Sequence, residues 1–324
     1  MAIQKYKFGS FNLRNFGKTA IGKRDFEKIA EIIRKEKFDV VALQEILSEG
    51  SALKKLVHNL LPGWEIKWGE PEESSDYLKA RDKRGEGFAF IWNTRRLSLA
   101  TSSTEKGMRV YEPRSVNKAL RYDCTMFARI PYYARFIPVN GGFFEFRLVN
   151  VHLHFGDNSV TEIEKRKFEY EFLTERIYPS ISAERRYGNN REAYTIVMGD
   201  YNLNLYKSRG EAEKRINSRT YIKPELVINN QRILTVQDQL TTLKTADTDE
   251  YTNDDNKNRG YSQNYDHFTF DVAHFDADNI KYKYNRVDAV RKYCNDDFEM
   301  YRAEISDHIP IALEITMNSG GYNE

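Results

Sequence analysis

Cysteine is the rarest residue in this sequence, because only Cys124 and Cys294 occur among its 324 residues. Two thiols are too few for a disulfide framework, so we expect both to be reduced. No apolar run approaches the roughly 18 residues that a membrane-spanning helix needs, and the N-terminus has no signal-peptide core. These absences argue against a disulfide-stapled secreted domain and against a membrane partner, and they predict a cytoplasmic location.

An excess of charge of one sign is also lacking, since 50 lysines and arginines face 48 aspartates and glutamates. A formal net charge of +2 does not by itself require a polyanionic partner. Basic residues outnumber acidic ones between Glu105 and Arg135, which gives weak support for a phosphate-rich ligand. Hydrophobic residues make up 40% of the chain, so a sizeable core is available.

Several common catalytic motifs are missing. The sequence has no G-x-S-x-G elbow, no Walker loop and no C-x-x-C pair, which argues against the chemistry of each. The pair His152 and His154 resembles part of a zinc site, but Gly156, Asp157 and Asn158 do not continue a ligand pattern.

Repeats, linkers and low-complexity tracts are absent too, so we expect one domain over residues 1–324. Its elaborated segment, at about 203–262, shows only short helical or loop patterns. Elsewhere the apolar periodicity predicts helices over Ser51–Leu60 and over about Ser159–Tyr178, the second ended by Pro179, and a strand over Cys124–Ile130. Residues 286–293 also have a helical pattern.

The stretch Ile196-Val197-Met198-Gly199-Asp200-Tyr201-Asn202 has the pattern of a buried strand that ends at a glycine. Asp200 and Asn202 are two residues apart and therefore point the same way in extended backbone. A carboxylate beside an amide suits the positioning of a water or a hard metal against an anionic substrate. A simple Asp-Asn turn that caps its own backbone is the alternative.

Polar groups recur at the ends of the predicted strands. Four strands end on one, and three begin just after one: Asn12, Glu45, His152 and Asp200, then Glu86, Asp266 and Asp307-His308. In a mixed sheet, the ends of strands that run one way lie beside the starts of strands that run the other. All of these groups are thus able to meet on one rim, where rigid strands position chemistry and loops are free.

The residue types on this rim complement one another. Asn12, Glu45 and Asp307 offer oxygen ligands for a hard cation such as Mg²⁺, with Mn²⁺ as an alternative. His152 and His308 are able to carry protons near neutral pH. Two further acids, Glu86 and Asp266, are suited to orient and charge those imidazoles.

Seven sequence blocks resemble the endonuclease/exonuclease/phosphatase superfamily, and within it deoxyribonuclease I and its bacterial relatives. The blocks occur in family order and span nearly the whole chain: Phe11-Asn12-Leu13-Arg14-Asn15-Phe16-Gly17, Leu43-Gln44-Glu45, the strand around Glu86, Val151-His152-Leu153, Met198-Gly199-Asp200-Tyr201-Asn202, Tyr265-Asp266-His267 and Ser306-Asp307-His308-Ile309-Pro310. The resemblance implies an α/β four-layer sandwich, in which two mixed β-sheets lie face to face with helices outside.

The resemblance also implies roles for the rim residues. Glu45, with Asn12 and Asp307, would bind the divalent metal, and Asp200 and Asn202 would position and activate water. His152 with Glu86, and His308 with Asp266, would hold the phosphate and manage the proton. Arg14 and Arg121 would contact the DNA backbone.

The sequence therefore predicts a magnesium-dependent phosphodiesterase with DNA as its partner, most specifically an endonuclease. Two alternatives stay open at this point. One is a phosphatase or lipid phosphodiesterase on the same fold, which the lack of an inositol-phosphatase pattern around Asp266 disfavours. The other is a catalytically silent nucleic-acid-binding module, which a missing acid or histidine would favour.

Overall fold

Alternating and fully apolar strand segments pair into two sheets in the computed structural model. It describes residues 3–47, 50–69, 85–104, 107–121, 124, 126–140, 142, 144–157, 159–183, 192–205, 221–228, 231–245 and 260–318. The first sheet has the order β17 (Lys281–Arg286), β18 (Ile311–Asn318), β1 (Ile3–Phe16), β2 (Val40–Leu47), β4 (Glu86–Asn93) and β3 (Trp64–Gly69). β1 and β2 are parallel and the other pairs antiparallel, so the sheet is mixed.

The second sheet has eight strands. Seven follow the order β14 (Glu225–Ile228), β15 (Gln231–Val236), β16 (Asp266–Asp271), β11 (Glu192–Asp200), β10 (Phe144–His152), β9 (Tyr132–Pro138) and β5 (Leu97–Leu99), and β8 (Arg114–Ser115) pairs with β9. β10 and β11 form its parallel pair. Two small ribbons complete the strands: β6 (Thr101–Thr104) with β7 (Gly107–Val110), and β12 (Asn204–Leu205) with β13 (Tyr221–Ile222).

Three apolar clusters separate the layers. Inward-facing side chains of both sheets, such as Phe8, Phe90, Phe146 and Phe268, form the central one. Edge-to-face contacts such as Phe8 with Phe146, at a centroid distance of 4.8 Å, join the two sheets. Because each sheet buries both faces, its strands are apolar on both sides rather than alternating.

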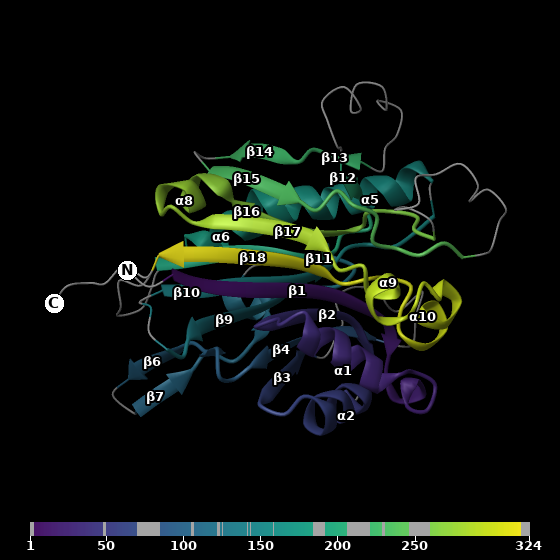
Figure 1. Ribbon diagram of the computed structural model, residues 1–324. Helices are drawn as coiled ribbons and strands as arrows, with labels where there is room; N and C mark the ends of the chain where they lie inside the picture. The colour runs from purple at the N-terminus through teal and green to yellow at the C-terminus, as the bar shows by residue number, and fades with distance from the viewer. Residues whose placement is uncertain are drawn as a thin grey trace.

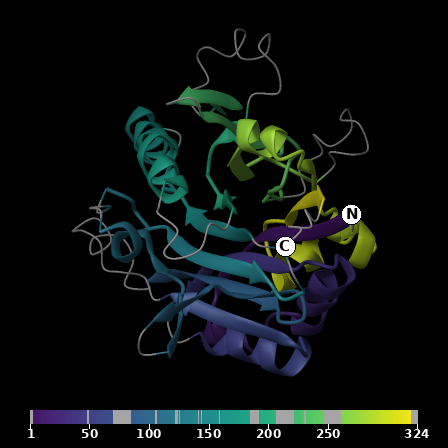
Figure 2. The same ribbon diagram turned by 90° about the vertical axis from the view of Figure 1, so that its left-hand side faces the viewer.

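Helices cover the outer face of each sheet (Figures 1 and 2). On the first sheet lie α1 (Phe26–Lys35), α2 (Ser51–Leu60), α9 (Ala289–Tyr293) and α10 (Phe298–Glu304), with the short 3₁₀ turn η1 (Lys18–Ala20). On the second lie α4 (Val116–Leu120), α5 (Val160–Phe172), the π-helical turn η2 (Leu173–Ile177) and α6 (Tyr178–Ser182). α8 (Val272–Ala277) closes one end of the central cluster. This is the four-layer α/β sandwich that the sequence predicts.

Some of the predicted helices and strands are confirmed, and others are wrong. Helix α2 has the predicted bounds, but the strand predicted over Cys124–Ile130 is wrong. Residues 126–129 form a turn and bends there, because the Ala128 N–H donates to the buried carboxylate of Glu169 instead of to a sheet neighbour. Cys124 and Cys294 are both buried free thiols.

The long helix does not end at Pro179, as the sequence predicts, but continues to Ser182. The π-helical turn η2 precedes the proline, which then occupies the first turn of α6, where no N–H is needed. The segment predicted to hold only short helices or loops contributes β12 to β15, while its residues 206–220 and 246–259 lie outside the described residues. Within residues 286–293, Arg286 ends a strand and the helix covers only 289–293.

Candidate active site

Breaks in strand pairing shape the rim at the end of β1 and β2. The β1–β2 register shifts between Asn12 and Phe16, and the β2–β4 register shifts between Leu43 and Ile46. Glu45 lies inside the second shift with φ of 56°, in the left-handed region that non-glycine residues rarely occupy. Irregularities of this kind re-aim side chains at functional rims.

The irregular backbone brings Asn12 and Glu45 together. The Asn12 Nδ2 group donates to Glu45 Oε1 at 2.9 Å and to Asp200 Oδ2 at 3.1 Å. The second oxygen of Glu45 accepts from the backbone N–H of Asn15 at 2.9 Å, and Asn12 Oδ1 accepts from that of Arg14. The amide of Asn12 therefore links the carboxylates of the two sheets.

Strand register brings the second half of the site together. His152 on β10 is the register partner of Asp200 on β11, and Asp200 is in turn the partner of Asp266 on β16. Gly199 makes this pairing possible, since a Cβ at this residue would lie 1.9 Å from the carbonyl oxygen of Val151. Three functional side chains therefore lie in a row across adjacent strands.

The segment before β18 supplies His308. Its Nδ1 lies 2.9 Å from Asp266 Oδ2, and its backbone N–H donates to the Ser306 hydroxyl at 3.1 Å. Ser306 donates in turn to the carbonyl of Asn12 at 2.7 Å, which ties this segment to β1. The predicted pairing of His308 with Asp266 is therefore present.

Asp200 lies at the centre of the cluster. Its Oδ2 is 3.5 Å from His152 Nε2 and 3.6 Å from His308 Nε2, while its Oδ1 accepts from the backbone N–H of Asn202 at 2.9 Å. Burial raises the pKa of Asp200 to about 7, with His308 lowering it and Asp266 raising it. The carboxyl is thus able to exchange a proton near neutral pH.

The two imidazoles have opposite pKa shifts. Burial, then the charges of Arg129 and His308, hold the pKa of His152 well below its ordinary value. Burial alone would also lower the pKa of His308, but the carboxylates of Asp266 and Asp200 outweigh it and raise the pKa well above that value. His152 is therefore neutral and His308 charged near pH 7.

Arg129 is a site residue that the sequence did not single out. Its Nε lies 2.6 Å from Glu86 Oε2, whereas His152 Nδ1 is 3.7 Å from the same oxygen, beyond hydrogen-bond reach. The predicted Glu86–His152 pair is thus loose, and Glu86 pairs first with Arg129. The only sequence signal for Arg129 was its place in the basic stretch 105–135, of which residues 105, 106, 122, 123 and 125 lie outside the described residues.

Asn202 contributes mainly through its backbone. Its φ of 51° turns its N–H onto Asp200, while its Nδ2 donates to the Leu153 carbonyl at 3.0 Å. The His154 side chain pairs with helix α5 and not with the rim residues: its Nε2 lies 2.5 Å from Glu162 Oε2. A zinc pair of His152 and His154 is therefore not formed.

The two arginines predicted to contact DNA differ in their position relative to the predicted metal ligands. The Arg14 Nε lies 3.3 Å from Asp307 Oδ2, beside the Asn12 and Glu45 pair, and its side chain is 36% exposed. Arg121 is exposed at the end of α4 in a left-handed conformation, with φ of 55°. The geometry thus joins Arg14, but not Arg121, directly to the predicted metal ligands.

Buried amides support the rim from below. Gln44 Nε2 donates to Asn150 Oδ1 at 2.7 Å, and Asn150 Nδ2 donates to the carbonyls of Leu43 and Ala89 at 3.0 Å. These carbonyls lie where the β2–β4 pairing breaks. Asn150 therefore donates to backbone carbonyls beside the break in pairing and holds them in place.

The donor set fits a hard divalent cation. Burial, then the negative charge of Glu86, raise the pKa of Glu45, and a cation beside it would offset both effects. Side-chain atoms of Asp200, Asp266 and His308 lie within 4.8 Å of one another, close enough to share an ion. Two buried atoms of the site, His152 Nδ1 and Asp266 Oδ1, have no hydrogen-bond partner among the described residues. A catalytic role, or a bound water or ion, would account for such atoms.

Solved structures of several phosphoesterases have the same fold as this chain. An endonuclease/exonuclease/phosphatase family protein from Bacteroides thetaiotaomicron is 14% identical with a TM-score of 0.54, covering 100% of this chain and 99% of its own. TDP2 from D. rerio, complexed with a single strand DNA product, is 13% identical with a TM-score of 0.53, covering 96% and 99%. A mannosyl-6-phosphatase from Bacteroides thetaiotaomicron is 17% identical with a TM-score of 0.50, covering 96% and 99%.

None of the curated proteins matches this sequence. The model of the Endonuclease/Exonuclease/phosphatase family, however, matches residues 9–268, which is most of the chain. Fold, rim chemistry and this match agree, and the chain belongs to the endonuclease/exonuclease/phosphatase family, whose fold is that of a phosphoesterase.

Proposed function

We propose that this protein is a cytoplasmic, metal-dependent phosphodiesterase, and specifically a DNA endonuclease that uses Mg²⁺, with Mn²⁺ as an alternative. One observation carries the proposal. The Asp200 carboxylate lies within 3.6 Å of two imidazoles whose pKa values are shifted in opposite directions. Groups with separated pKa values are what acid–base chemistry on a phosphodiester requires.

The metal would be held by Glu45 with Asn12 and Asp307. When bound, it would supply positive charge to the phosphate oxygens and to the leaving group. Asn12 directs its Nδ2 at Glu45 and its Oδ1 at the Arg14 N–H, so a half-turn of its amide would present the oxygen instead. Arg14 and Asp307 are already paired, which keeps Asp307 beside this group.

Proton transfer would be divided between the central residues. Water attacks phosphorus in line, and its proton passes to Asp200, which the Asn202 N–H holds in place. The bond from phosphorus to the leaving oxygen breaks, and that oxygen takes a proton from Nε2 of the charged His308, whose Nδ1 is held by Asp266. Neutral His152 would hold a phosphate oxygen through an N–H, with Glu86 and Arg129 behind it.

DNA is the proposed substrate because one partly exposed cation lies at the site and a fully exposed one follows α4. Arg14 is adjacent to the metal ligands, and Arg121 is exposed at the end of α4. The similar TDP2 structure holds a single strand DNA product. None of the helices in the described ranges is both long and apolar enough to span a membrane.

The test uses purified protein with supercoiled plasmid, RNA, a phosphomonoester and vesicles containing a phosphoinositide, each with magnesium and with chelator. We expect magnesium-dependent nicking of the plasmid that the chelator abolishes. Fast phosphomonoester or lipid turnover without nicking would show instead that the protein is a phosphatase or a lipid phosphodiesterase. Plasmid binding with no turnover of any substrate would indicate a catalytically silent binding module.

A further inference from the structure

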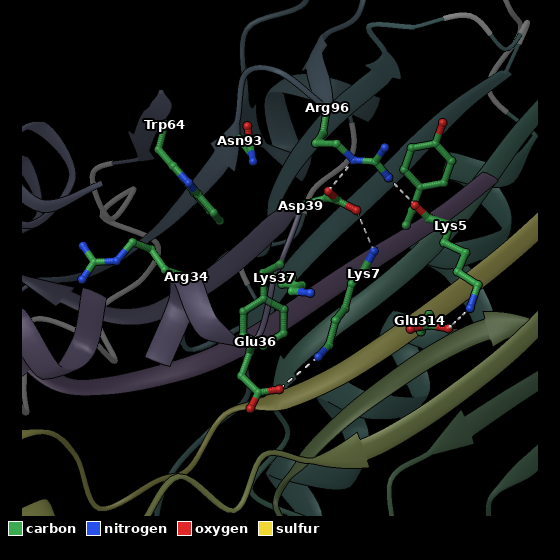
Figure 3. A pocket seen from close by; sticks show the side chains of 12 residues that line it. Lys5, Lys7, Arg34, Glu36, Lys37, Asp39, Trp64, Asn93, Arg96 and Glu314 are labelled. Carbon is green, nitrogen blue, oxygen red and sulfur yellow. Dashed lines mark hydrogen bonds and ion pairs between the residues drawn. The ribbon is translucent and has the colours of Figure 1, made fainter. Parts of the chain in front are cut away.

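A hollow lies at the end of the first sheet that is remote from the active site. It has a volume of about 530 Å³ and lies where β1 begins, before β2 begins and where β4 ends (Figure 3). Asn12 and Lys7 are five residues apart on β1, so the hollow is separated from the active site by roughly 17 Å or more of strand. The two sites therefore share no side chains.

The carboxylates around this hollow are all neutralised by cations. Asp39 accepts from Arg96 Nε and from the Lys7 N–H, each at 2.9 Å. Glu36 lies 3.0 Å from the ammonium groups of Lys7 and Lys292, and Glu314 lies 3.4 Å from that of Lys5. No carboxylate here is left to attract a further cation.

Hydrogen-bond donors, in contrast, are in excess. Lys37 follows α1 with φ of 55°, and its exposed ammonium group has no partner within the described part of the chain. Asn93 uses its Oδ1 to accept from the Arg95 N–H, and its Nδ2 has no acceptor among the described residues. Arg34 bonds the Leu60 carbonyl, and Figure 3 shows its guanidinium directed away from Lys37. Free donors without free acceptors select an anion.

One aromatic ring in the lining is also available. The Lys7 ammonium lies over the Phe38 ring at 5.2 Å, and the Arg96 guanidinium lies over the Tyr6 ring at 5.3 Å. The half-buried indole of Trp64 packs against the apolar cluster of the first sheet and has no cation over it among the described residues, so its exposed part is what a ligand would meet. Figure 3 shows Trp64 and Arg34 on one side of the hollow, Arg96, Lys5 and Lys7 on the other, and Lys37 between them.

We propose that this hollow binds a small phosphorylated compound with a planar ring, of which a nucleoside monophosphate is the simplest example. Its volume lies within the range of ligand pockets, roughly 300–1,000 Å³. The ammonium of Lys37, a compact point charge, binds the phosphate, and the Asn93 Nδ2 group donates to it. Trp64 packs against the ring, since an indole face stacks on any base.

Calorimetric titration of the full chain tests the proposal, with chelator present to suppress metal-dependent binding at the active site. The probes are adenosine monophosphate, adenosine, inorganic phosphate and a short single-stranded oligonucleotide. We expect one site for adenosine monophosphate, weaker binding of phosphate and none of adenosine. Tighter binding of the oligonucleotide with the same dependence on Lys37 would identify the ligand as a nucleotide within a strand.

Matched variants locate the site. Lys37→Gln removes the charge but keeps the stem, and it should weaken binding by about tenfold or more. Lys35→Gln, two residues earlier on α1 and paired with Glu31, should change affinity less than twofold. Trp64→Leu should lower the affinity for adenosine monophosphate more than the affinity for inorganic phosphate. Lys37→Met repeats the charge test should Lys37→Gln fold poorly.

Three results would overturn the proposal: no saturable binding of adenosine monophosphate, equal binding of adenosine, or equal losses in Lys37→Gln and Lys35→Gln. The first would leave the hollow without this class of ligand. The second would show that the phosphate contributes nothing to binding. The third would show that any nearby positive charge, and not Lys37 in particular, attracts the ligand.

Discussion

At the residue scale, the environment of each histidine sets its charge. His152 is buried beside Arg129 and stays neutral, while His308 faces two carboxylates and stays charged. The Asp200 carboxylate lies 3.5 Å from one ring and 3.6 Å from the other, which is ion-pair range and slightly longer than a hydrogen bond. His154, only two residues from His152, is bound to Glu162 and takes no part in this arrangement.

This difference predicts unequal effects of three alanine substitutions. His152→Ala and His308→Ala should each lower turnover about 10²–10⁴-fold, as expected for loss of a positioned acid or base. His154→Ala should stay within about tenfold of wild type, because that imidazole pairs with Glu162 on helix α5 and has no assigned part in proton transfer. Initial rates on plasmid, with melting temperatures as the folding control, check this. Equal collapse of all three would revive a zinc site, which bound-metal analysis would then decide.

A glycine gives a second prediction at this scale. Gly199→Ala would place a Cβ 1.9 Å from the Val151 carbonyl oxygen, so β10 and β11 would have to separate. We expect a loss of more than about 3 kcal/mol in the free energy of unfolding, measured by denaturant titration. The control is Gly22→Ala, where φ is 84° but nothing lies within 4 Å, so only backbone strain of about 1–2 kcal/mol applies. Equal losses in both variants would contradict this account of the rim.

At the element scale, the sequence predicted some strand ends correctly and others wrongly. β10 and β11 end at His152 and Asp200, and β16 begins at Asp266, as predicted. β1, however, continues past Asn12 to Phe16 and β2 past Glu45 to Leu47, because register shifts let each strand go on pairing beyond the polar residue. The left-handed turn at Glu45 is not visible in a sequence pattern, because it arises from register shifts between three strands.

Long-range contacts explain the other failures. Residues 124–130 have strand-like apolarity, yet Glu169, about forty residues later, accepts the Ala128 N–H in place of a sheet neighbour. Arg129 enters the site from this same segment, so its role depends on a contact that local propensity does not encode. The helix continues past Pro179 because a π-helical turn precedes it.

Glu169 on α5 also gives a prediction of pH dependence. Its carboxylate bonds the N–H groups of Ala128 and His154, but burial raises its pKa to about 7. Between its ordinary pKa and that value, the native state binds more protons than the unfolded state. The free energy of unfolding should therefore fall as pH rises from about 4.5 to 7, by up to about 3 kcal/mol from this group.

Melting temperatures of wild type and Glu169→Gln between pH 4.5 and 8 check this. The glutamine side chain has one acceptor oxygen fewer for the two backbone N–H groups, so the variant should melt at a lower temperature than wild type at pH 5. The difference in melting temperature should narrow toward pH 8. Glu164→Gln, an exposed position on the same helix, should follow the wild-type curve. Parallel curves for wild type and Glu169→Gln would show that Glu169 does not titrate in this range.

At the scale of the whole molecule, the two ends of the first sheet differ in chemistry. The end with Asn12 and Glu45 carries the acids and histidines of the candidate active site, with Arg14 beside them. The opposite end carries the cation-rich hollow around Lys37. DNA bound for cleavage should therefore contact cations at the first end only.

The salt dependence of plasmid binding tests whether DNA contacts cations at the first end only. The logarithm of plasmid affinity should fall linearly with the logarithm of salt concentration, with a slope of about −0.9 for each neutralised phosphate. Arg14→Ala and Arg121→Ala should each flatten the slope by about one contact, while hydrolysis of a small aryl phosphodiester is largely unchanged. Arg95→Ala, an exposed control beyond the far end of β4, should leave the slope unchanged. Binding that is insensitive to salt would contradict DNA as the substrate.

Hydrolysis of the aryl phosphodiester at graded magnesium concentrations tests the central proposal most directly, because this substrate needs only the metal and the central acids and histidines. Glu45→Gln keeps the shape of the side chain but removes the charge that would hold the cation. We predict that wild type is active and inhibited by chelator, and that Glu45→Gln loses turnover at low magnesium while its melting temperature is retained. Full activity of Glu45→Gln at low magnesium, or wild-type activity that survives the chelator, would contradict metal-dependent catalysis at this site.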